Sequence, residues 1–175
     1  MRITSSREPR LWMMGMLMIM MATLTGCGIW KGSMSHHPSG TTPIFDEMKS
    51  QLITLERADG SRLQITAKIA DNLAKQAAGF QKISPEIIKK SAILFVFKEP
   101  IESFFHMHNV EAPLDIAFMD SDGHFIDIET MQMGPTLYGP DQPFQFALEI
   151  RAGFFAENKF SMKGSKMLLL PLNPK

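Results

Sequence analysis

The chain has 175 residues, of which 45% are hydrophobic, with 18 basic and 18 acidic side chains and one cysteine. This length allows one ordinary domain besides a targeting segment. A formal net charge of zero excludes a strongly basic surface for nucleic acid, and a single cysteine excludes an internal disulfide.

The first 26 residues have the layout of a cleavable export signal. Arg2, Arg7 and Arg10 precede an uncharged run whose apolar centre covers residues 12–24. This centre is shorter than the roughly 20 residues that a membrane-spanning helix needs. Three arginines and one glutamate lie in this segment, so 15 basic and 17 acidic side chains remain after it. We therefore expect residues 1–26 to be removed, and we expect no nucleic-acid partner.

The signal ends in Leu24, Thr25, Gly26 and Cys27, which resembles the lipobox of bacterial lipoproteins. The resemblance implies a diacylglyceryl thioether on Cys27, cleavage before it, and acylation of the new amino terminus. Lipidation removes a lone thiol from an oxidising compartment, and two or more acyl chains anchor a protein stably in a membrane. An uncleaved signal anchor and a soluble secreted protein are the alternatives. Gly28 after the cysteine favours the outer membrane, with the protein facing the periplasm.

Residues 27–49 are rich in Gly, Ser, Thr, Pro and His and show no sustained hydrophobic period. This composition predicts a lipidated tether, followed by a single domain over residues 50–175. His36 and His37 lie in the tether, where solvated side chains are the expected state and a metal site is the alternative.

The first strands of the domain form a predicted hairpin. Apolar and polar residues alternate over 52–57 and 63–69, on either side of a turn that contains Asp59 and Gly60. Residues 92–97 are continuously apolar and too few for a buried helix, which predicts a central strand covered on both faces.

Three short helices are expected. Asp71 is placed to cap a helix in which Leu73, Ala77 and Phe80 recur at helical spacing. The second begins at Ser84 and Pro85 and continues to Lys90, and the third covers 154–159 after Gly153.

The remaining strands are expected at 103–109, 114–119, 124–131, 144–150 and 167–170. A turn at 120–123 joins two of them, and a Gly- and Pro-rich loop occupies 134–143. About eight strands with two or three short helices predict a mainly β domain, an antiparallel jelly-roll or barrel-like sandwich.

The middle of the domain contains a motif of nine positions: Met107, Asn109, Pro113, Leu114, Asp115, Ile116, Phe118, Asp120 and Gly123. It resembles the uncharacterised family known as domain of unknown function 192. Further likeness at Gly79–Phe80, 94–97, Leu148–Glu149, Ala152–Gly153 and Gly164 extends the resemblance over about 51–170. The family implies one compact, mainly β domain that is often exported, and it brings no established reaction, substrate or cofactor. His106, His108 and Val110 depart from the Trp, Lys and Thr that are usual in the family.

Two pairs of side chains suggest a metal site. His106 and His108 are two apart on an expected strand, so they share one face about 6.6 Å apart along the backbone. Met131 and Met133 repeat this spacing, and imidazole with thioether favours copper. The alternative is that the histidines face solvent and the methionines pack the sheet.

Asn109 and Asp115 are candidate ligand-binding residues. Pro113 has no amide hydrogen to donate, so the chain between them is expected to turn at a rim of the sheet. Phe104, Phe118 and Phe125 are available to wall a pocket there. The alternative is that Asp115 and Asn109 hydrogen-bond backbone groups near the strand ends.

No nucleophile elbow, phosphate-binding loop, zincin motif or dinucleotide fingerprint occurs in the sequence. The leading hypothesis is a membrane-anchored lipoprotein whose β domain is a non-catalytic binding or accessory module, with a small ligand or an envelope protein as partner and no cofactor. One alternative is an envelope protein that binds copper or another metal through His106 and His108. The other is a hydrolase-like enzyme with Asp115 in a cleft.

Overall fold

The computed structural model describes residues 40–168. The predicted signal, Cys27, His36 and His37 lie outside the described residues. Within 40–168 the structure contains no helix that is long and apolar enough to cross a membrane.

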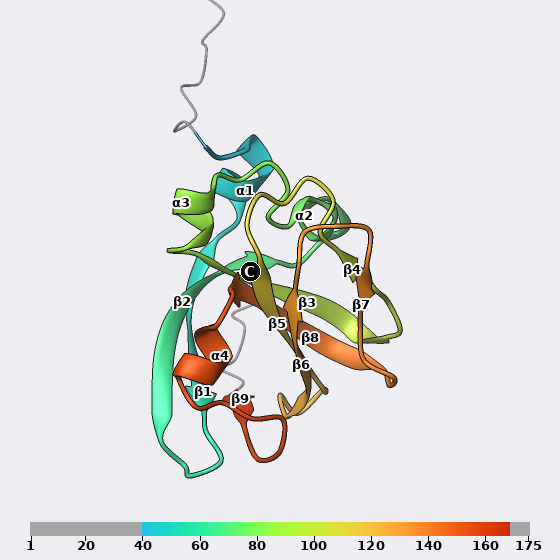
Figure 1. Cartoon of the computed structure of the whole chain (residues 1–175). Coiled ribbons are helices and arrows are strands. Elements are labelled where there is room, and N and C mark those ends of the chain that lie inside the picture. Colours follow the sequence, from blue (N-terminus) through green and yellow to red (C-terminus); the bar gives the residue numbers. More distant parts are fainter. Residues whose placement is uncertain (1–39, 169–175) are drawn as a thin grey trace, which may run out of the picture. The chain divides into compact units, whose positions relative to one another are not determined.

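The described residues form nine strands and four short helices, and six of the strands, β3 to β8, follow one another without a helix between them (Figure 1). Their bounds are α1 Pro43–Glu47, β1 Ser50–Glu56, β2 Arg62–Ala70, α2 Leu73–Ala78, α3 Pro85–Ile88, β3 Ala92–Ile101, β4 Phe105–His106, β5 Leu114–Met119, β6 Phe125–Met131, β7 Leu137–Tyr138, β8 Phe144–Arg151, α4 Phe154–Glu157 and β9 Lys166–Leu168.

Seven of these strands form one curled sheet in the order β6-β5-β8-β3-β2-β1-β9, and β4 pairs with β7 in a separate ribbon (Figure 1). The pairs are antiparallel except for β2 and β3, which are parallel because the connection through α2 and α3 returns the chain to the same end of the sheet. The predicted mainly β, barrel-like fold is confirmed. It contains one parallel pair and, among the described residues, four short helices instead of two or three.

The two strand predictions for the first half of the domain are confirmed. β1 and β2 form the hairpin, with Gly60 at φ 81° and the Asp59 carboxylate accepting from the backbone N–H of Ser61. β3 lies in the middle of the sheet, and its residues from Ala92 to Phe95 are buried.

The last part of the predicted tether belongs to the folded domain. Thr42 caps α1 by accepting from the backbone N–H of Phe45, and Pro43 starts the helix with a preset φ. Phe45 is buried against the ring of Phe80, with centroids 5.9 Å apart, and the ammonium of Lys68 lies 4.6 Å from its centroid. The predicted boundary between tether and domain at residue 49 is therefore too late. A helix of five residues with one buried aromatic ring is too short to show a hydrophobic period in the sequence.

The other helix predictions need small corrections. Asn72, not Asp71, caps α2 by accepting from the backbone N–H of Lys75. Asp71 instead pairs with the Lys75 ammonium at 2.6 Å. α2 ends before Gly79, whose φ of 47° is a conformation that side chains disfavour, so Phe80 lies beyond the helix.

The strand expected at 103–109 is mostly a turn. Only Phe105 and His106 pair, and their partner is β7, inside the region expected to be a plain loop. The backbone N–H of Val110 donates to the carbonyl of Met107, and Asn109 between them has φ 58°. An alternating pattern does not distinguish a strand from a tight turn that buries alternate side chains.

The sheet separates two hydrophobic clusters, because alternate strand residues face opposite sides. One cluster contains Ile93 and Phe95 and is covered by α1, α3 and the segment around Phe80. The other contains Leu94 and Leu148, packs against α4, and includes the phenylalanines of that helix. The strand β8 lies between β3 and β5, and its two faces pack in different clusters, with Ala147 in the first and Leu148 in the second.

Candidate functional site

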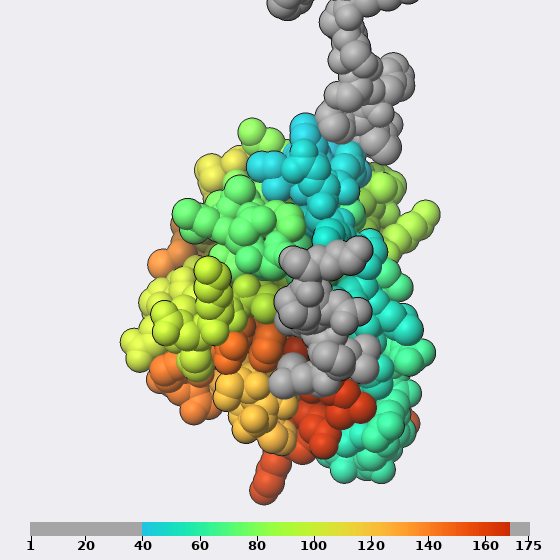
Figure 2. Space-filling model, turned by 180° about the vertical axis from the view of Figure 1, so that it is seen from behind, coloured from blue at the N-terminus to red at the C-terminus, as the bar shows by residue number. Residues whose placement is uncertain are grey.

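A cavity of about 370 Å³ lies between α2, the outer end of β3 and β4. Figure 2 shows the face on which α2, in green, adjoins the yellow-green residues that follow the outer end of β3. Five phenylalanines contribute to the cavity wall: Phe80, Phe95, Phe97, Phe104 and Phe105. Its volume falls in the range of small-ligand pockets.

Glu149 contributes the carboxyl group of this cavity. It shares a face of β8 with Ala147, and its cross-strand neighbours are Ile93 on β3 and Ile116 on β5. The residue is 5% exposed, and its Oε2 is buried without a hydrogen-bond partner among the described residues. A Cβ placed on Gly79 would lie 3.7 Å from this oxygen, so the carboxyl points towards the end of α2.

Burial raises the pKa of Glu149 from its ordinary value of 4.5 to about 8. Desolvation is the cause, since the surrounding side chains replace water with apolar atoms and give the anion no counter-ion. At neutral pH the group is therefore mostly a neutral carboxylic acid. A carboxyl with this environment in a cavity is a typical feature of functional sites.

Glu149 was not among the residues selected from the sequence, although the family resemblance included it. The available signal was one glutamate in an otherwise apolar strand segment, Phe146 to Ile150. Sequence alternation alone did not place a cavity beside that position, because α2 and β4 reach it from distant parts of the chain.

The structure brings the two candidate histidines together but separates the two methionines. The rings of His106 and His108 lie 6.3 Å apart, and the backbone N–H of His108 donates to His106 Nδ1. Met131 is fully buried in the core, whereas Met133 is 59% exposed just beyond the end of β6. The pattern of alternation fails there because the strand ends at Met131.

Asp115 lies on the opposite face of the sheet from Glu149 and is 3% exposed. Its Oδ1 accepts from the hydroxyl of Thr130 at 2.8 Å, and its Oδ2 accepts from the backbone N–H of Phe155 at 3.2 Å. Phe155 is in the first turn of α4, whose N-cap is Gly153 and has no side chain to accept from it. Asp115 therefore performs the capping role from a neighbouring strand.

Asn109 is exposed and lies away from Asp115. Its amide donates to Gln81 Oε1, and its carbonyl accepts from the backbone N–H of Lys82. The two candidate ligand-binding residues thus have separate partners and do not form one site. Of the phenylalanines expected beside them, Phe104 lines the Glu149 cavity, and Phe118 and Phe125 belong to the two different core clusters.

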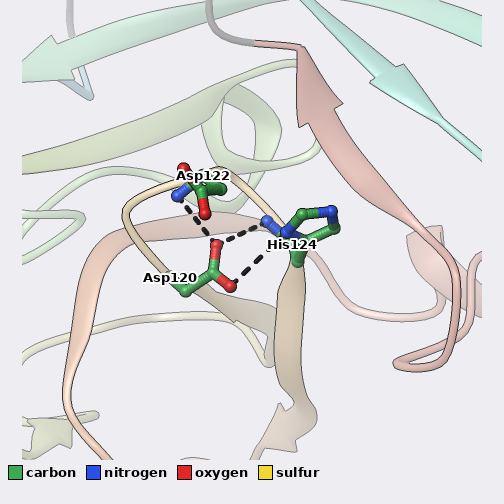
Figure 3. A group of neighbouring side chains, drawn as sticks. All are labelled: Asp120, Asp122 and His124. Atoms are coloured by element: carbon green, nitrogen blue, oxygen red, sulfur yellow. Dashed lines mark hydrogen bonds and ion pairs between the residues drawn. The ribbon is translucent and has the colours of Figure 1, made fainter.

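A third group of polar side chains lies in the turn between β5 and β6. Oxygen or nitrogen atoms of Asp120, Asp122 and His124 approach within 4.8 Å of one another. Figure 3 shows that Asp120 accepts from the backbone N–H groups of Asp122 and His124 and faces the His124 ring, with 3.5 Å between Oδ2 and Nδ1. These contacts close the turn predicted at 120–123.

We predict that Asp115→Ala lowers the free energy of unfolding by about 1–3 kcal/mol, because the buried N–H of Phe155 loses its acceptor. Asp115→Asn keeps an oxygen in place and should cost less. Urea denaturation measures both, with the exposed Asp122→Ala as a comparison. Wild-type stability of Asp115→Ala would contradict the capping role.

We predict that Glu149 makes stability decrease with pH. Below about 4.5 both the folded and the unfolded state hold the proton, so ionisation costs nothing. Between 4.5 and about 8 the unfolded state ionises first, so folding loses free energy, up to about 5 kcal/mol once both states are ionised.

Glu149→Gln should remove this pH dependence and be more stable than wild type at pH 8. The exposed Glu99→Gln on β3 is the matched control and should keep the wild-type profile. Urea midpoints measured between pH 4 and pH 9 provide the test. Parallel profiles for wild type and Glu149→Gln would show that Glu149 ionises normally.

Comparison with known proteins supports the fold and places the chain in a family. No curated protein matches the sequence. A Sinorhizobium meliloti 1021 protein, described as a "putative transcription regulator", is 22% identical with a TM-score of 0.63, over 69% of this chain and 93% of its own. A protein of unknown function from Novosphingobium aromaticivorans DSM 12444 is 23% identical with a TM-score of 0.63, over 75% of this chain and 94% of its own. At these identities the likeness concerns the fold alone.

The model of the family DUF192, described as "Uncharacterized ACR", matches residues 54–167. This match covers more than half of the chain and includes both Asp115 and Glu149. It confirms the resemblance found in the sequence motif. The chain belongs to the domain of unknown function 192 family.

Proposed function

We propose that this protein is a lipid-anchored protein of the bacterial envelope whose β domain binds a small molecule in the Glu149 cavity. One observation carries the binding role: a carboxyl oxygen is buried without a partner among the described residues and faces a cavity. Burying such a group costs free energy unless something bonds to it. A ligand that reaches the cavity would supply the missing bond.

The chemistry of the wall supports binding of a compact, partly apolar molecule. Aromatic rings supply area for contact, and few polar groups converge on the space, which is the usual composition of ligand pockets. Two exposed apolar side chains, Leu73 and Phe104, lie among the lining residues. They would extend the contact area towards solvent.

The lipid anchor is supported by the sequence before the domain. Leu24 to Cys27 resemble a lipobox, and Cys27 is the one cysteine of the chain. Residues between the anchor and Gly40 would hold the domain near the membrane, and Gly28 favours the outer membrane. Such a protein would present its cavity to the periplasm.

Binding of an organic molecule is favoured over the two alternatives by where their residues lie. A copper site would have to use His106 and His108 without Met131, which is fully buried. A hydrolase would need a reactive Asp115, yet both oxygens of this carboxylate accept hydrogen bonds that hold α4 and Thr130.

The anchor leads to a first expectation for cells. Expressed in a bacterium, the wild-type protein should fractionate with membranes and start at a lipid-modified Cys27, as seen by mass spectrometry. Cys27→Ser should move it to the soluble fraction, while Ser33→Ala in the same segment should leave it bound. An unmodified amino terminus at another residue would overturn the anchor.

The cavity leads to a second expectation, for the lipidated protein in detergent micelles. Benzyl alcohol, a small neutral probe, should perturb NMR signals of the cavity residues at millimolar concentration. Ala77 is exposed on α2 and lines the cavity, so Ala77→Trp should weaken binding at least about tenfold by filling the space, whereas Ala77→Ser should not. Binding that is absent, or unaffected by Ala77→Trp, would contradict the proposed site.

A further inference from the structure

The charge of the cavity wall is one-sided. Glu149 is the acidic residue there, and none of the described residues that line the cavity is a lysine or an arginine. His106 of β4 is the other titratable side chain of the wall. The helix α2 lines part of the cavity, and the ammonium of its Lys75 forms an ion pair with the Asp71 carboxylate at 2.6 Å. The Glu149 carboxyl therefore has no counter-ion in the wall, and it becomes a negative charge when a cation enters and its proton leaves.

The apolar part of the wall has the same preference. The face of a phenylalanine ring is electron-rich, so it attracts a cation that lies over it. Phe95 and Phe105 pack edge to face, with centroids 5.0 Å apart, and both line the cavity that contains Glu149. Rings and carboxylate would thus act together on a positively charged group.

We propose that the cavity binds a small organic amine, with its ammonium group hydrogen-bonded to Glu149 and its apolar body between the phenylalanine rings. This inference rests on the proposed function, because it specifies the class of ligand that the same cavity takes. An anion would disfavour ionisation of Glu149 and would find no lysine or arginine among the described residues that line the cavity. A bare metal ion would need several oxygen or nitrogen ligands, and the wall offers one carboxyl group, Glu149, and one imidazole, His106.

Binding of an amine would displace a proton. In the empty protein at neutral pH, Glu149 carries its proton because burial raises its pKa to about 8. An incoming ammonium keeps its own protons and donates an N–H to the carboxylate, while the proton of the Glu149 O–H leaves for solvent. Affinity should therefore rise about tenfold per pH unit below 8, where one proton is released for each amine bound.

The test compares three probes of one shape on the lipidated protein in detergent micelles: benzylamine, benzyl alcohol and benzoate. Isothermal titration calorimetry, with empty micelles as the blank, measures affinity at pH 6, 7 and 8. Repeating pH 7 in buffers of different ionisation enthalpy counts the protons released. The variants are Glu149→Gln, the exposed control Glu99→Gln, and His106→Gln, which removes the other titratable group of the wall.

The expected result is that benzylamine binds at least about tenfold more tightly than benzyl alcohol, with proton release. Glu149→Gln should lose the preference and the pH dependence, whereas His106→Gln and Glu99→Gln should keep the slope with pH. Equal binding of benzyl alcohol and benzylamine, blocked by Ala77→Trp, would overturn the proposed preference for an amine but leave the proposed binding function. Preferred binding of benzoate would also overturn it, and binding of none of the probes would overturn both proposals.

Discussion

The structure depends on the burial of β8 between β3 and β5. Residues Phe146 to Ile150 of this strand pair with β3 on one side and with β5 on the other, and each face is covered by one of the two hydrophobic clusters. The side chains of such a strand are usually apolar, because water does not reach a polar group there to hydrogen-bond with it. Glu149 breaks this rule at the centre of the sheet, and the cavity under α2 is where the exception becomes accessible to a ligand.

The two buried carboxyls of the sheet show how much depends on the neighbouring elements. Asp115 on β5 and Glu149 on β8 lie in adjacent strands and face opposite sides. α4 presents the backbone N–H of Phe155 to Asp115, so that carboxylate has a partner. On the other side, the C-terminal end of α2 at Gly79 lies beside Glu149, and no group of the described residues bonds to Oε2. One carboxyl stabilises the fold, and the other remains available.

The backbone conformation of Gly79 contributes to this difference between Asp115 and Glu149. Its φ of 47° ends α2, and its missing side chain leaves the space between Phe95 and the carboxyl oxygen unfilled. An unfilled space beside an unpaired acid lowers the stability of the fold. Proteins commonly retain such destabilising features at sites of function. This arrangement is consistent with the proposed ligand site, and with the proposed lipid anchor it would place that site close to a membrane.

The sequence by itself determined the class of the fold, most strand positions and the family. It also led to the hypothesis of an export signal. These follow from local properties: alternation, turn residues such as Asp59–Gly60, an apolar run at 92–97, and a motif of fixed spacing. It did not determine α1, the turn at 107–109 or the roles of the two carboxylates. Asp115 and Glu149 look alike in the sequence, as acids within apolar strands. Only the tertiary structure decided which one meets a helix N-terminus and which one faces a cavity, because those neighbours come from segments distant along the chain.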